Sequence, residues 1–498
     1  MKKAISVLLS FILLTTLIAS SFTAYSLGNK PPYPLPSSGE CGDNASYTFD
    51  SGSGLLTISG SGEITDSAWY QGHETSFYVS PFFGNADIKK VVINNGITYL
   101  GDCTFNSCTG ITSVSLPDGL TVIGESAFYN CTSLAAVNFP SSLKNVKKDA
   151  LYNTAYYNNG AHWENGVMYV NNLIAAVINT SSIAVKSGVK TIPSGMFSGL
   201  NNLQSLSLPV TVTEIEEYAF ENCTGLKSVS VPKGVSEIPY GAFMNCISLN
   251  SVTLSSGLIS IGQNAFKNCS ALTAVTIPAT VKSIGKYAFS DCGSLSSINL
   301  PNSVETLGSA AFSSCGALKK AVLSNSITSI ESYTFRDCKS LESIYIPAGV
   351  TFFGSDSFKD CKSLKTILFG GSESQYNSIK KLDSPVYYSS PVIKYNSSKP
   401  IVKKNNPVVA KGKTVKVKRN KKTVIKKSKA FTIKNAKGTV TFKRSKGNKK
   451  ITVAKNGKIT VKKGLKKGTY KVKVKVTAKG NAEYKSAVKT VTVVIKVK

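Results

Sequence analysis

The sequence predicts a β-dominated α/β repeat solenoid with a 23-residue period, followed by a separate all-β domain. Two observations predict the solenoid: apolar residues recur at fixed places in each unit, and cysteines recur at steps of 23. Such a period is typical of one supersecondary unit copied and stacked. A third observation predicts the second domain, because the net positive charge lies after residue 400. The cysteines in register are Cys108, Cys131, Cys223, Cys246, Cys269, Cys292, Cys315, Cys338 and Cys361.

The unit between Cys223 and Cys246 indicates how one coil is built. Val229 and Val231 are spaced by two, as on a strand with alternate side chains facing inward. Pro232 then ends the strand, because proline cannot donate the next ladder hydrogen bond. A second short extended piece follows, and an Ala-Phe pair then predicts a short helical turn. The recurring apolar positions are Leu226, Val229, Val231, Val235, Ile238, Ala242 and Phe243.

The cysteine register also predicts the number of coils. Extrapolated back by 23 it falls on Asn85, and from Asn85 to Cys361 it spans 276 residues, or twelve steps, so we expect about thirteen coils. At a strand spacing of roughly 4.8 Å their sheet would be about 60 Å long. One unit alone cannot fold, because burial gains roughly 1.5–3 kcal/mol per apolar side chain while ordering costs roughly 1.5 kcal/mol per residue.

The pattern L-x-x-V-x-I-P, followed by an Ala-Phe pair and a cysteine, resembles the leucine-rich repeat of the BspA-like bacterial surface proteins. Nine cysteine-bearing copies keep this register over most of the chain. The resemblance implies a leucine-rich solenoid that serves adhesion or recognition at a bacterial cell surface. We expect it to bind a host or bacterial surface protein or a glycan. The alternative is an extracellular structural scaffold that displays other parts without its own specific ligand.

The N-terminal residues predict export. Residues 1–26 read as a secretory signal peptide, since Lys2 and Lys3 precede an uncharged apolar run and a small-x-small cleavage site ends at Ser26. A membrane anchor helix is the alternative, but the run is short for a span of about 20 residues. We therefore expect a secreted protein associated with the cell surface or cell wall, with no transmembrane anchor after signal cleavage.

The remaining boundaries follow from composition. A Gly-rich turn at 51–54 between alternating segments predicts a β-hairpin, which would cover the apolar face of the first coil. Trp69 is expected to plug the core there rather than to serve as a ligand platform. The predicted parts are an N-terminal spacer and hairpin cap at 27–83, the solenoid at 84–396 with its C-terminal cap at 370–396, a linker at 397–407 and the basic domain at 408–498.

The repeat is interrupted once, where Thr154 and, two steps later, Leu200 hold the cysteine slot. Turn signals between them predict a β-hairpin island at 155–180. The island gathers the aromatic residues Tyr156, Tyr157, His162, Trp163 and Tyr169. Such a cluster could bind a ligand, but we favour the simpler interpretation that the rings pack the hairpin onto the solenoid.

The cysteines predict buried thiols rather than disulfides. Their common slot would bring neighbours within disulfide reach, but Asn85, Thr154 and Leu200 also fill it, which indicates a packing role. A zinc site is not expected, because no C-x-x-C motif occurs and only His73 and His162 could add ligands. No nucleophile motif, paired-carboxylate repeat or phosphate-binding glycine loop is present. We expect no enzyme and no cofactor.

The strand positions that point away from the core predict a binding face. They carry small hydroxyls in most coils, such as Ser228 and Ser230, and become apolar and aromatic in the last coils. Tyrosine anchors many interfaces, so the C-terminal end is the favoured hot spot. A merely solvated face is the alternative. The predicted ligand-binding residues are Asn299, Ser343 and Tyr345, together with Tyr156 and Trp163 of the island.

The C-terminal part carries the whole net charge. From Ile401 to Lys498 there are 33 Lys and Arg against one acid, Glu483, or +32, which equals the net charge of the full chain. Alternating segments such as 471–478 and 489–498 predict about seven short strands in an antiparallel sandwich. The segment 463–493 is similar to the bacterial Ig-like domains of secreted proteins.

A field of this strength attracts polyanions. We expect anionic cell-wall polymers as partners, with acidic lipids or host glycans as alternatives, and no nucleic acid in vivo for a secreted protein. Lysines that merely keep a β-rich module soluble are the other interpretation.

Overall fold

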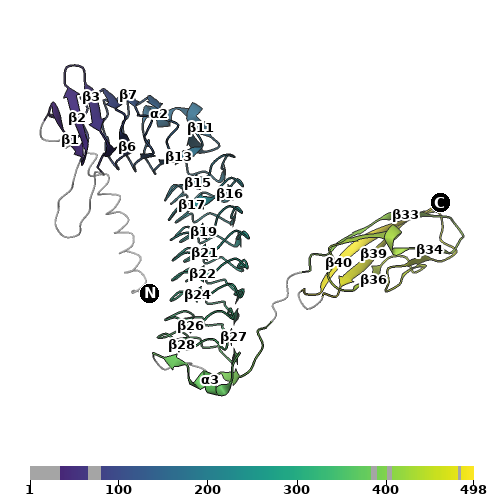
Figure 1. Cartoon of the computed structure of the whole chain (residues 1–498). Helices are drawn as coiled ribbons and strands as arrows, with labels where there is room; N and C mark the ends of the chain where they lie inside the picture. Colours follow the sequence, from purple (N-terminus) through teal and green to yellow (C-terminus); the bar gives the residue numbers. More distant parts are fainter. Residues whose placement is uncertain (1–33, 66–79, 383–389, 401–405, 481–483) are drawn as a thin grey trace, which may run out of the picture. The chain divides into compact units, whose positions relative to one another are not determined.

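The computed structural model describes residues 34–65, 80–382, 390–400, 406–480 and 484–498 (Figure 1). The chain divides into two compact units, Met1–Ser398 and Lys399–Lys498. The predicted signal segment at 1–26 and the predicted core plug Trp69 lie outside the described residues. Among the described residues, no helix combines the length and apolar character needed to cross a membrane.

The first unit begins with the predicted hairpin. β2 and β3 pair antiparallel up to Asp50 opposite Leu55, and Gly54 closes the turn at φ +70°. β3 then pairs parallel with the first solenoid strand, so the hairpin continues the sheet and covers its end. The strands of the cap are β1 (Ser38–Gly42), β2 (Ala45–Asp50), β3 (Leu55–Gly60) and β4 (Gly62–Glu63).

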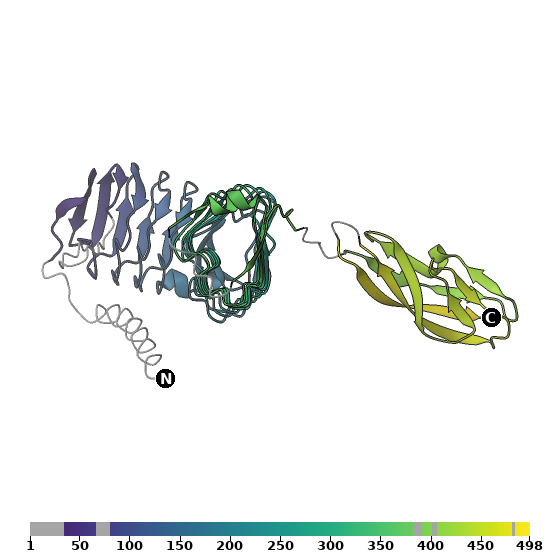
Figure 2. The same cartoon turned by 90° about the horizontal axis from the view of Figure 1, so that it is seen from below.

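Most coils of the solenoid contribute two short strands, and Figure 2 looks along the coils that follow the island. Equivalent residues of neighbouring coils pair in parallel at steps of 23, as in Val229 with Val252 and Ile261 with Ile284, which confirms the predicted period. The first strands are β5 (Lys90–Ile93), β7 (Ser113–Ser115), β9 (Ala136–Asn138), β14 (Ser182–Ala184), β16 (Ser205–Ser207), β18 (Ser228–Ser230), β20 (Ser251–Thr253), β23 (Ser297–Asn299), β25 (Lys320–Val322), β27 (Ser343–Ile346) and β29 (Thr366–Phe369). The second strands are β6 (Ile97–Leu100), β8 (Val122–Ile123), β10 (Asn145–Val146), β15 (Thr191–Ile192), β17 (Glu214–Ile215), β19 (Glu237–Ile238), β21 (Ser260–Ile261), β22 (Ser283–Ile284), β24 (Thr306–Leu307), β26 (Ser329–Ile330) and β28 (Phe352–Phe353).

The expectation of one continuous sheet is wrong. The first strands form three separate ladders, which are interrupted at the island and again at residues 274–276. At the second break the coil lacks its first strand, and Val275 is only half-buried, whereas its equivalents Val252 and Ile298 are buried. The core still runs through this break, because the buried residues on both sides belong to one apolar cluster.

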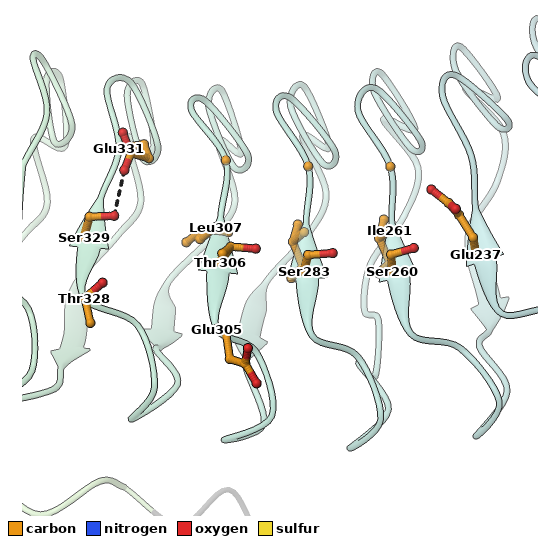
Figure 3. Close-up of a pocket in the computed structure, with 14 residues that line it drawn as sticks. Glu237, Ser260, Ile261, Ser283, Glu305, Thr306, Leu307, Thr328, Ser329 and Glu331 are labelled. Atoms are coloured by element: carbon orange, nitrogen blue, oxygen red, sulfur yellow. Dashed lines mark hydrogen bonds between the residues drawn. The ribbon is translucent and has the colours of Figure 1, made fainter.

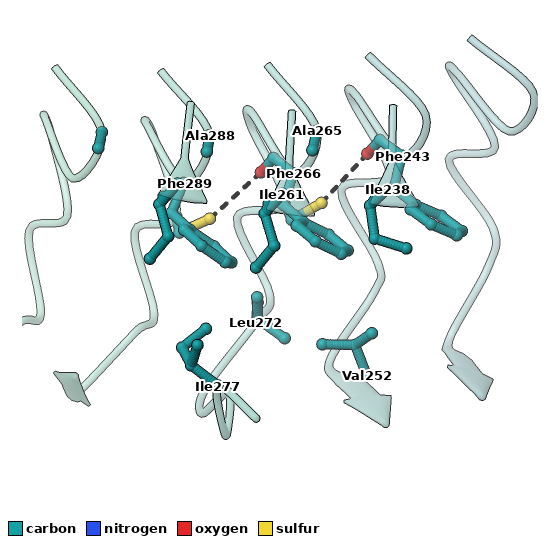
Figure 4. Close-up of a cluster of buried hydrophobic side chains, with 14 of the residues drawn as sticks. Ile238, Phe243, Val252, Ile261, Ala265, Phe266, Leu272, Ile277, Ala288 and Phe289 are labelled. Carbon is teal, nitrogen blue, oxygen red and sulfur yellow. Dashed lines mark hydrogen bonds between the residues drawn. The ribbon is translucent and has the colours of Figure 1, made fainter. Parts of the chain in front are cut away.

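Phenylalanines at one slot form the spine of the core. Phe243, Phe266 and Phe289 are fully buried and stack with ring centroids 5.3 Å apart (Figure 4). The segment around each ring is a run of hydrogen-bonded turns, and the helical turn predicted for the Ala-Phe pair is not formed. Left-handed residues flank each pair, as Tyr287 (φ +57°) and Asp291 (φ +61°) flank Phe289. Asn and Asp precede most cysteines because they tolerate this conformation.

The cysteines in register are buried and unpaired, as predicted. Each thiol donates to the carbonyl oxygen of the phenylalanine in the preceding coil, for example Cys269 to Phe243 at 3.2 Å and Cys292 to Phe266 at 3.3 Å (Figure 4). The thiol is therefore a coil-to-coil hydrogen-bond donor as well as a small packing group. Thr154 can replace cysteine because its hydroxyl caps the short helix that follows, accepting from the backbone N–H of Tyr157 at 2.9 Å.

The island joins two apolar cores. Val167 and Ile174 of its hairpin pack into the core of the later coils, whereas Met168, Val170 and Ala175 pack into the core of the earlier coils. The hairpin thus lies between two stacks and offers each of them an apolar face. Its elements are α2 (Ala155–Asn158), a 3-10 turn (Gly160–His162), β11 (Trp163–Glu164), β12 (Val167–Val170) and β13 (Leu173–Val177), whose strands pair antiparallel.

A small cap closes the C-terminal end of the solenoid. Ser372 and Gln375 form a reciprocal capping box on α3 (Glu373–Asn377), and the buried Tyr376 of that helix packs edge-on against Phe369. β31 (Val392–Lys394) then adds a parallel strand to β29, and β30 (Lys380–Lys381) adds one to β28. The last coil therefore has a cover on its apolar face.

The second unit is rich in strands around a core of its own. The segments predicted as strands are strands, but β33 pairs parallel with β40, so the unit is not wholly antiparallel. Its three sheets are β32–β35, β33–β40–β39–β36 and β34–β38–β37. The elements are β32 (Val409–Gly412), β33 (Thr414–Val417), β34 (Thr423–Ile425), α4 (Lys427–Ala430), β35 (Phe431–Lys434), β36 (Val440–Lys446), β37 (Ile451–Val453), β38 (Ile459–Val461), β39 (Gly468–Ala478) and β40 (Ala487–Val497).

The phenylalanine spine gives a direct stability prediction. Phe266→Ala should lower the free energy of unfolding by about 3–5 kcal/mol, because it removes a fully buried ring from a stack that cannot collapse around the gap. Ile259→Ala, at a side chain 51% exposed, should change it by less than about 0.5 kcal/mol. Urea denaturation measures both, and a loss below about 1 kcal/mol for Phe266→Ala would contradict the role of the spine.

The buried thiols give a pH prediction. Burial raises the pKa of Cys108, Cys223 and Cys361 to about 12. An unfolded thiol has a pKa of about 8.5. The stabilisation that the neutral folded thiols contribute is therefore fully present below that pH, and it is lost as the pH rises toward the folded pKa. Stability should therefore fall from about pH 8.5 upward. The variant Cys108→Ala/Cys223→Ala/Cys361→Ala should lose stability less steeply with pH, because up to three fewer protons are released when it unfolds. Equal slopes of unfolding free energy against pH in the variant and the wild type would contradict this.

Candidate functional site

The first-strand ladder presents rows of exposed hydroxyls. Ser205, Ser228 and Ser251 lie in register on β16, β18 and β20. On each strand the next residue is a buried apolar side chain, and the one after it is exposed again. A second row on the same strands holds Ser207, Ser230 and Thr253. The rows repeat at the strand spacing of about 4.8 Å. The predicted hydroxyl face is therefore present on the coils before the break at 274–276.

The second-strand ladder carries a groove of about 470 Å³ (Figure 3). It crosses five neighbouring coils, from β19 to β26. Hydroxyls of equivalent residues line it, with those of Ser260, Ser283 and Thr306 repeating from coil to coil. Its lining is Glu237, Ser260, Ile261, Gly262, Ser283, Ile284, Gly285, Glu305, Thr306, Leu307, Gly308, Thr328, Ser329 and Glu331.

Three glycines at one slot make room for this groove. A Cβ on Gly285 would lie 2.6 Å from the backbone of Gly262 and Gln263, and a Cβ on Gly308 would lie 2.5 Å from the backbone of Lys286. A side chain at Gly285 or Gly308 would therefore force the preceding coil to shift. In the neighbouring coils the slot is held by Pro239 and Glu331, which bound the glycine stretch at both ends.

Three carboxylates give the groove a negative character. Glu237 lies at one end, and Glu331 at the other end accepts a hydrogen bond from the Ser329 hydroxyl at 2.6 Å (Figure 3). Glu305 forms a 2.7 Å ion pair with Lys282, but both side chains are more than half exposed, so the pair is readily exchanged for other partners. Among the residues that the structure describes, no lysine, arginine or aromatic side chain lines the groove. Such a lining suits an extended polar ligand with many hydrogen-bond donors.

The structure disperses the predicted binding residues of the last coils. Asn299 is exposed on β23 and Ser343 is half-buried on β27, in different rows. Tyr345 lies on the outer face of β27, since its neighbours Ile344 and Ile346 belong to the core, but it is only 5% exposed and so leaves little of its ring for a ligand. Its hydroxyl instead donates to the side-chain oxygen of Asn325 at 3.2 Å in the preceding coil. A large ring can lie along the sheet and gain burial, which a serine at the same position cannot do.

The aromatic island satisfies its own polar groups. The indole N–H of Trp163 donates to the carbonyl oxygen of Tyr157 at 2.7 Å, and the ring of Tyr156 stacks on His162 with centroids 3.7 Å apart. Nδ1 of His162 lies 2.8 Å from the carbonyl oxygen of Tyr156. Tyr156, Tyr157 and Trp163 all pack against the core of the earlier coils. This geometry supports packing as the role of the island.

The second unit carries a face of lysines. On β39, Lys471, Lys473 and Lys475 are exposed while the valines between them are buried in the core. Lys475 lies directly opposite Lys443 of β36. Like charges placed opposite each other on a sheet destabilise it, so these lysines repel one another across the two strands.

The described residues contain no group of three or more His, Cys, Asp or Glu side chains that could hold a metal ion.

The groove was not predicted from the sequence. Its signal was the recurrence of Gly262, Gly285 and Gly308 at the repeat period, each directly after a Ser-Ile or Thr-Leu pair.

Comparison with known families agrees with this geometry. The family profile described as "BspA type Leucine rich repeat region (6 copies)" matches residues 76–172, 170–282 and 259–390, which together cover more than half of the chain. The chain belongs to the BspA-type leucine-rich repeat family. Proteins built on this repeat are typically non-enzymatic binding scaffolds, and BspA-like proteins are cell-surface antigens.

Solved structures add examples of the repeat. A leucine-rich repeat protein from Bacteroides ovatus is 20% identical, with 71% of this chain and 89% of that chain covered and a TM-score of 0.39. A leucine rich cell surface protein from Faecalibacterium prausnitzii is 22% identical, with 72% and 100% covered and a TM-score of 0.32. The pneumococcal vaccine antigen PcpA is 15% identical, with 73% and 100% covered and a TM-score of 0.34. A search of curated proteins gives no match.

The groove of this BspA-type solenoid gives a prediction about its floor. Gly285→Ala should lower the free energy of unfolding by about 1–3 kcal/mol, because the added Cβ overlaps the backbone of the preceding coil. Gly293→Ala is the matched control, since a Cβ there meets nothing within 4 Å. It should be neutral or slightly stabilising. Thermal and urea unfolding of both variants test this, and equal stabilities would show that the coils are not closely apposed at Gly285.

Proposed function

We propose that this protein is a secreted recognition or adhesion protein of the bacterial surface. Its solenoid binds a glycan or a protein, and its basic unit retains it on anionic polymers of the envelope. The groove across five coils is the observation that carries the proposal, because it is a pre-formed recess in which hydroxyls and carboxylates recur on a regular stack. The second candidate is an extracellular scaffold without a ligand of its own, which a regular stack of coils would serve equally well.

The chemistry of the groove favours a glycan strand over a peptide with apolar anchors. Sugar hydroxyls can donate to the carboxylates of Glu237 and Glu331 and exchange hydrogen bonds with the Ser283 and Thr306 hydroxyls. The groove runs across the coils, so equivalent groups repeat at about 4.8 Å. A linear polymer of small polar units would meet the same groups at every coil.

The basic unit fits a retention role. We propose that it is an Ig-like β-sandwich, since two of its sheets, β33–β40–β39–β36 and β34–β38–β37, share one apolar core. Its single acid in sequence, Glu483, leaves the other charges to be balanced from outside. Retention through such a unit should weaken steeply with salt, because bound counterions are released when it attaches.

An array of glycans and matrix proteins tests the recognition function. The mature chain, residues 27–498, is applied at about 0.5 M salt, where the Debye length is only a few ångström and lysine-driven attachment is suppressed. We expect binding to a glycan. The absence of any bound glycan or protein would favour the scaffold function.

Two matched variants locate the ligand on the solenoid. Ser260→Ala/Ser283→Ala/Thr306→Val removes hydroxyls from the groove, and Ser205→Ala/Ser228→Ala/Ser251→Ala removes three from the first-strand face. If the groove holds the ligand, the first variant should bind at least tenfold more weakly, since each lost hydrogen bond contributes about 0.5–1.5 kcal/mol. The second should bind like the wild type. The reverse result would assign recognition to the first-strand face.

A further inference from the structure

The lysines of the second unit are ordered by the strand register into one track. We propose that the outward face of the sheet β33–β40–β39–β36 is a binding site for a linear phosphodiester polymer of the cell envelope. This inference rests on the proposed retention function and assigns it a place and a ligand class. The residues that form the track are Lys443 and Lys446 of β36 and Lys471, Lys473 and Lys475 of β39.

The register brings these five ammonium groups together. Lys443 lies opposite Lys475, and Lys446 lies opposite Lys473. A bulge between Arg444 and Lys446 makes the second pairing possible, because it adds one residue to β36 and shifts Lys446 to the outward side. All five side chains are exposed, while Val472, Val474 and Val476 of β39 face the core.

Solubility alone does not explain this placement. Lysines that protect a sheet from aggregation belong on its edges, but β39 is an inner strand with β36 on one side and β40 on the other. Opposed lysines destabilise the free sheet, and the unit has one acid in sequence to offset 33 cations after residue 400. A polyanion that bridges the two rows of lysines removes this repulsion.

The geometry fits a chain of phosphates better than a single anion. Successive lysines on β39 are two residues apart, or about 6.6–6.8 Å, so the track presents charges at short regular intervals. Thr490 and Thr492 of β40 lie exposed opposite Lys475 and Lys473 and supply hydroxyl donors beside the ammonium groups. Ammonium and hydroxyl donors together are suited to the oxygens of a phosphodiester.

A pair of variants with the same net charge tests the location. The track variant carries Lys→Gln at 443, 446, 471, 473 and 475. The control carries Lys→Gln at 421, 422, 449, 462 and 463, which are exposed and lie outside the track strands β36 and β39. The full-length mature protein is titrated with poly(glycerol phosphate) over a series of salt concentrations. Circular dichroism confirms that both variants are folded.

In the track variant the slope of log affinity against log salt should be smaller in magnitude than in the wild type by about 3 to 4, because each of five phosphate contacts contributes about 0.7. Its affinity at low salt should fall at least 100-fold, and that of the control less than tenfold. Equal losses in the two variants would overturn the track and leave retention by diffuse charge. If the wild-type protein fails to bind the polymer at all, the retention function itself is wrong.

Two further arms test the ligand class. Poly-γ-glutamate of matched charge should bind at least tenfold more weakly than poly(glycerol phosphate), and equal binding would overturn the preference for phosphodiesters. Protein attached to envelopes of a teichoic-acid-bearing bacterium should stay bound after nuclease treatment and be released when polyol phosphodiesters are cleaved. Release by nuclease would place the polymer in nucleic acid and contradict its assignment to the envelope.

Discussion

The contact between one coil and the next is the interaction on which this protein depends. It consists of three parts that recur at most steps: a stacked phenylalanine pair, a thiol that donates to the carbonyl oxygen of the preceding phenylalanine, and parallel backbone pairing. No coil buries its apolar residues alone, so stability comes from the interfaces between neighbours. The same dependence explains why both ends carry a cover, a hairpin before the first coil and the helix with Tyr376 after the last.

The island shows how a hairpin can replace one coil of a repeat. Its hairpin keeps the 23-residue register, since Ile174 occupies the slot that Phe197 holds one step later, and both residues are fully buried. It also divides its side chains between two cores, with Val167 facing one and Met168 the other. The aromatic residues around it are held by packing and by hydrogen bonds to backbone carbonyls, as for Trp163. A sequence that looks like a binding cluster therefore has a structural role here.

The two units combine different kinds of surface. The solenoid is electrically balanced and offers hydroxyls and a few carboxylates at fixed intervals, which favours recognition by directed hydrogen bonds. The second unit offers charge at fixed intervals, which favours attachment that is strong at low salt and tolerant of sequence and shape in its partner. The proposed attachment and the proposed recognition should depend differently on ionic strength, so salt should separate the two.

The sequence alone determined the features that follow from local patterns: the period, the buried thiols, the N-terminal hairpin, the strands of the basic unit and the location of its charge. The period and the thiols are the clearest of these, because most copies of the repeat carry the same residue types at the same positions. Only the tertiary structure decided which residues meet across coils and strands. It placed Tyr345 over Asn325 rather than in solvent, opened the groove at Gly285, and turned Lys446 outward through a bulge. These outcomes depend on a neighbour's bulk and register, and no single repeat carries that information.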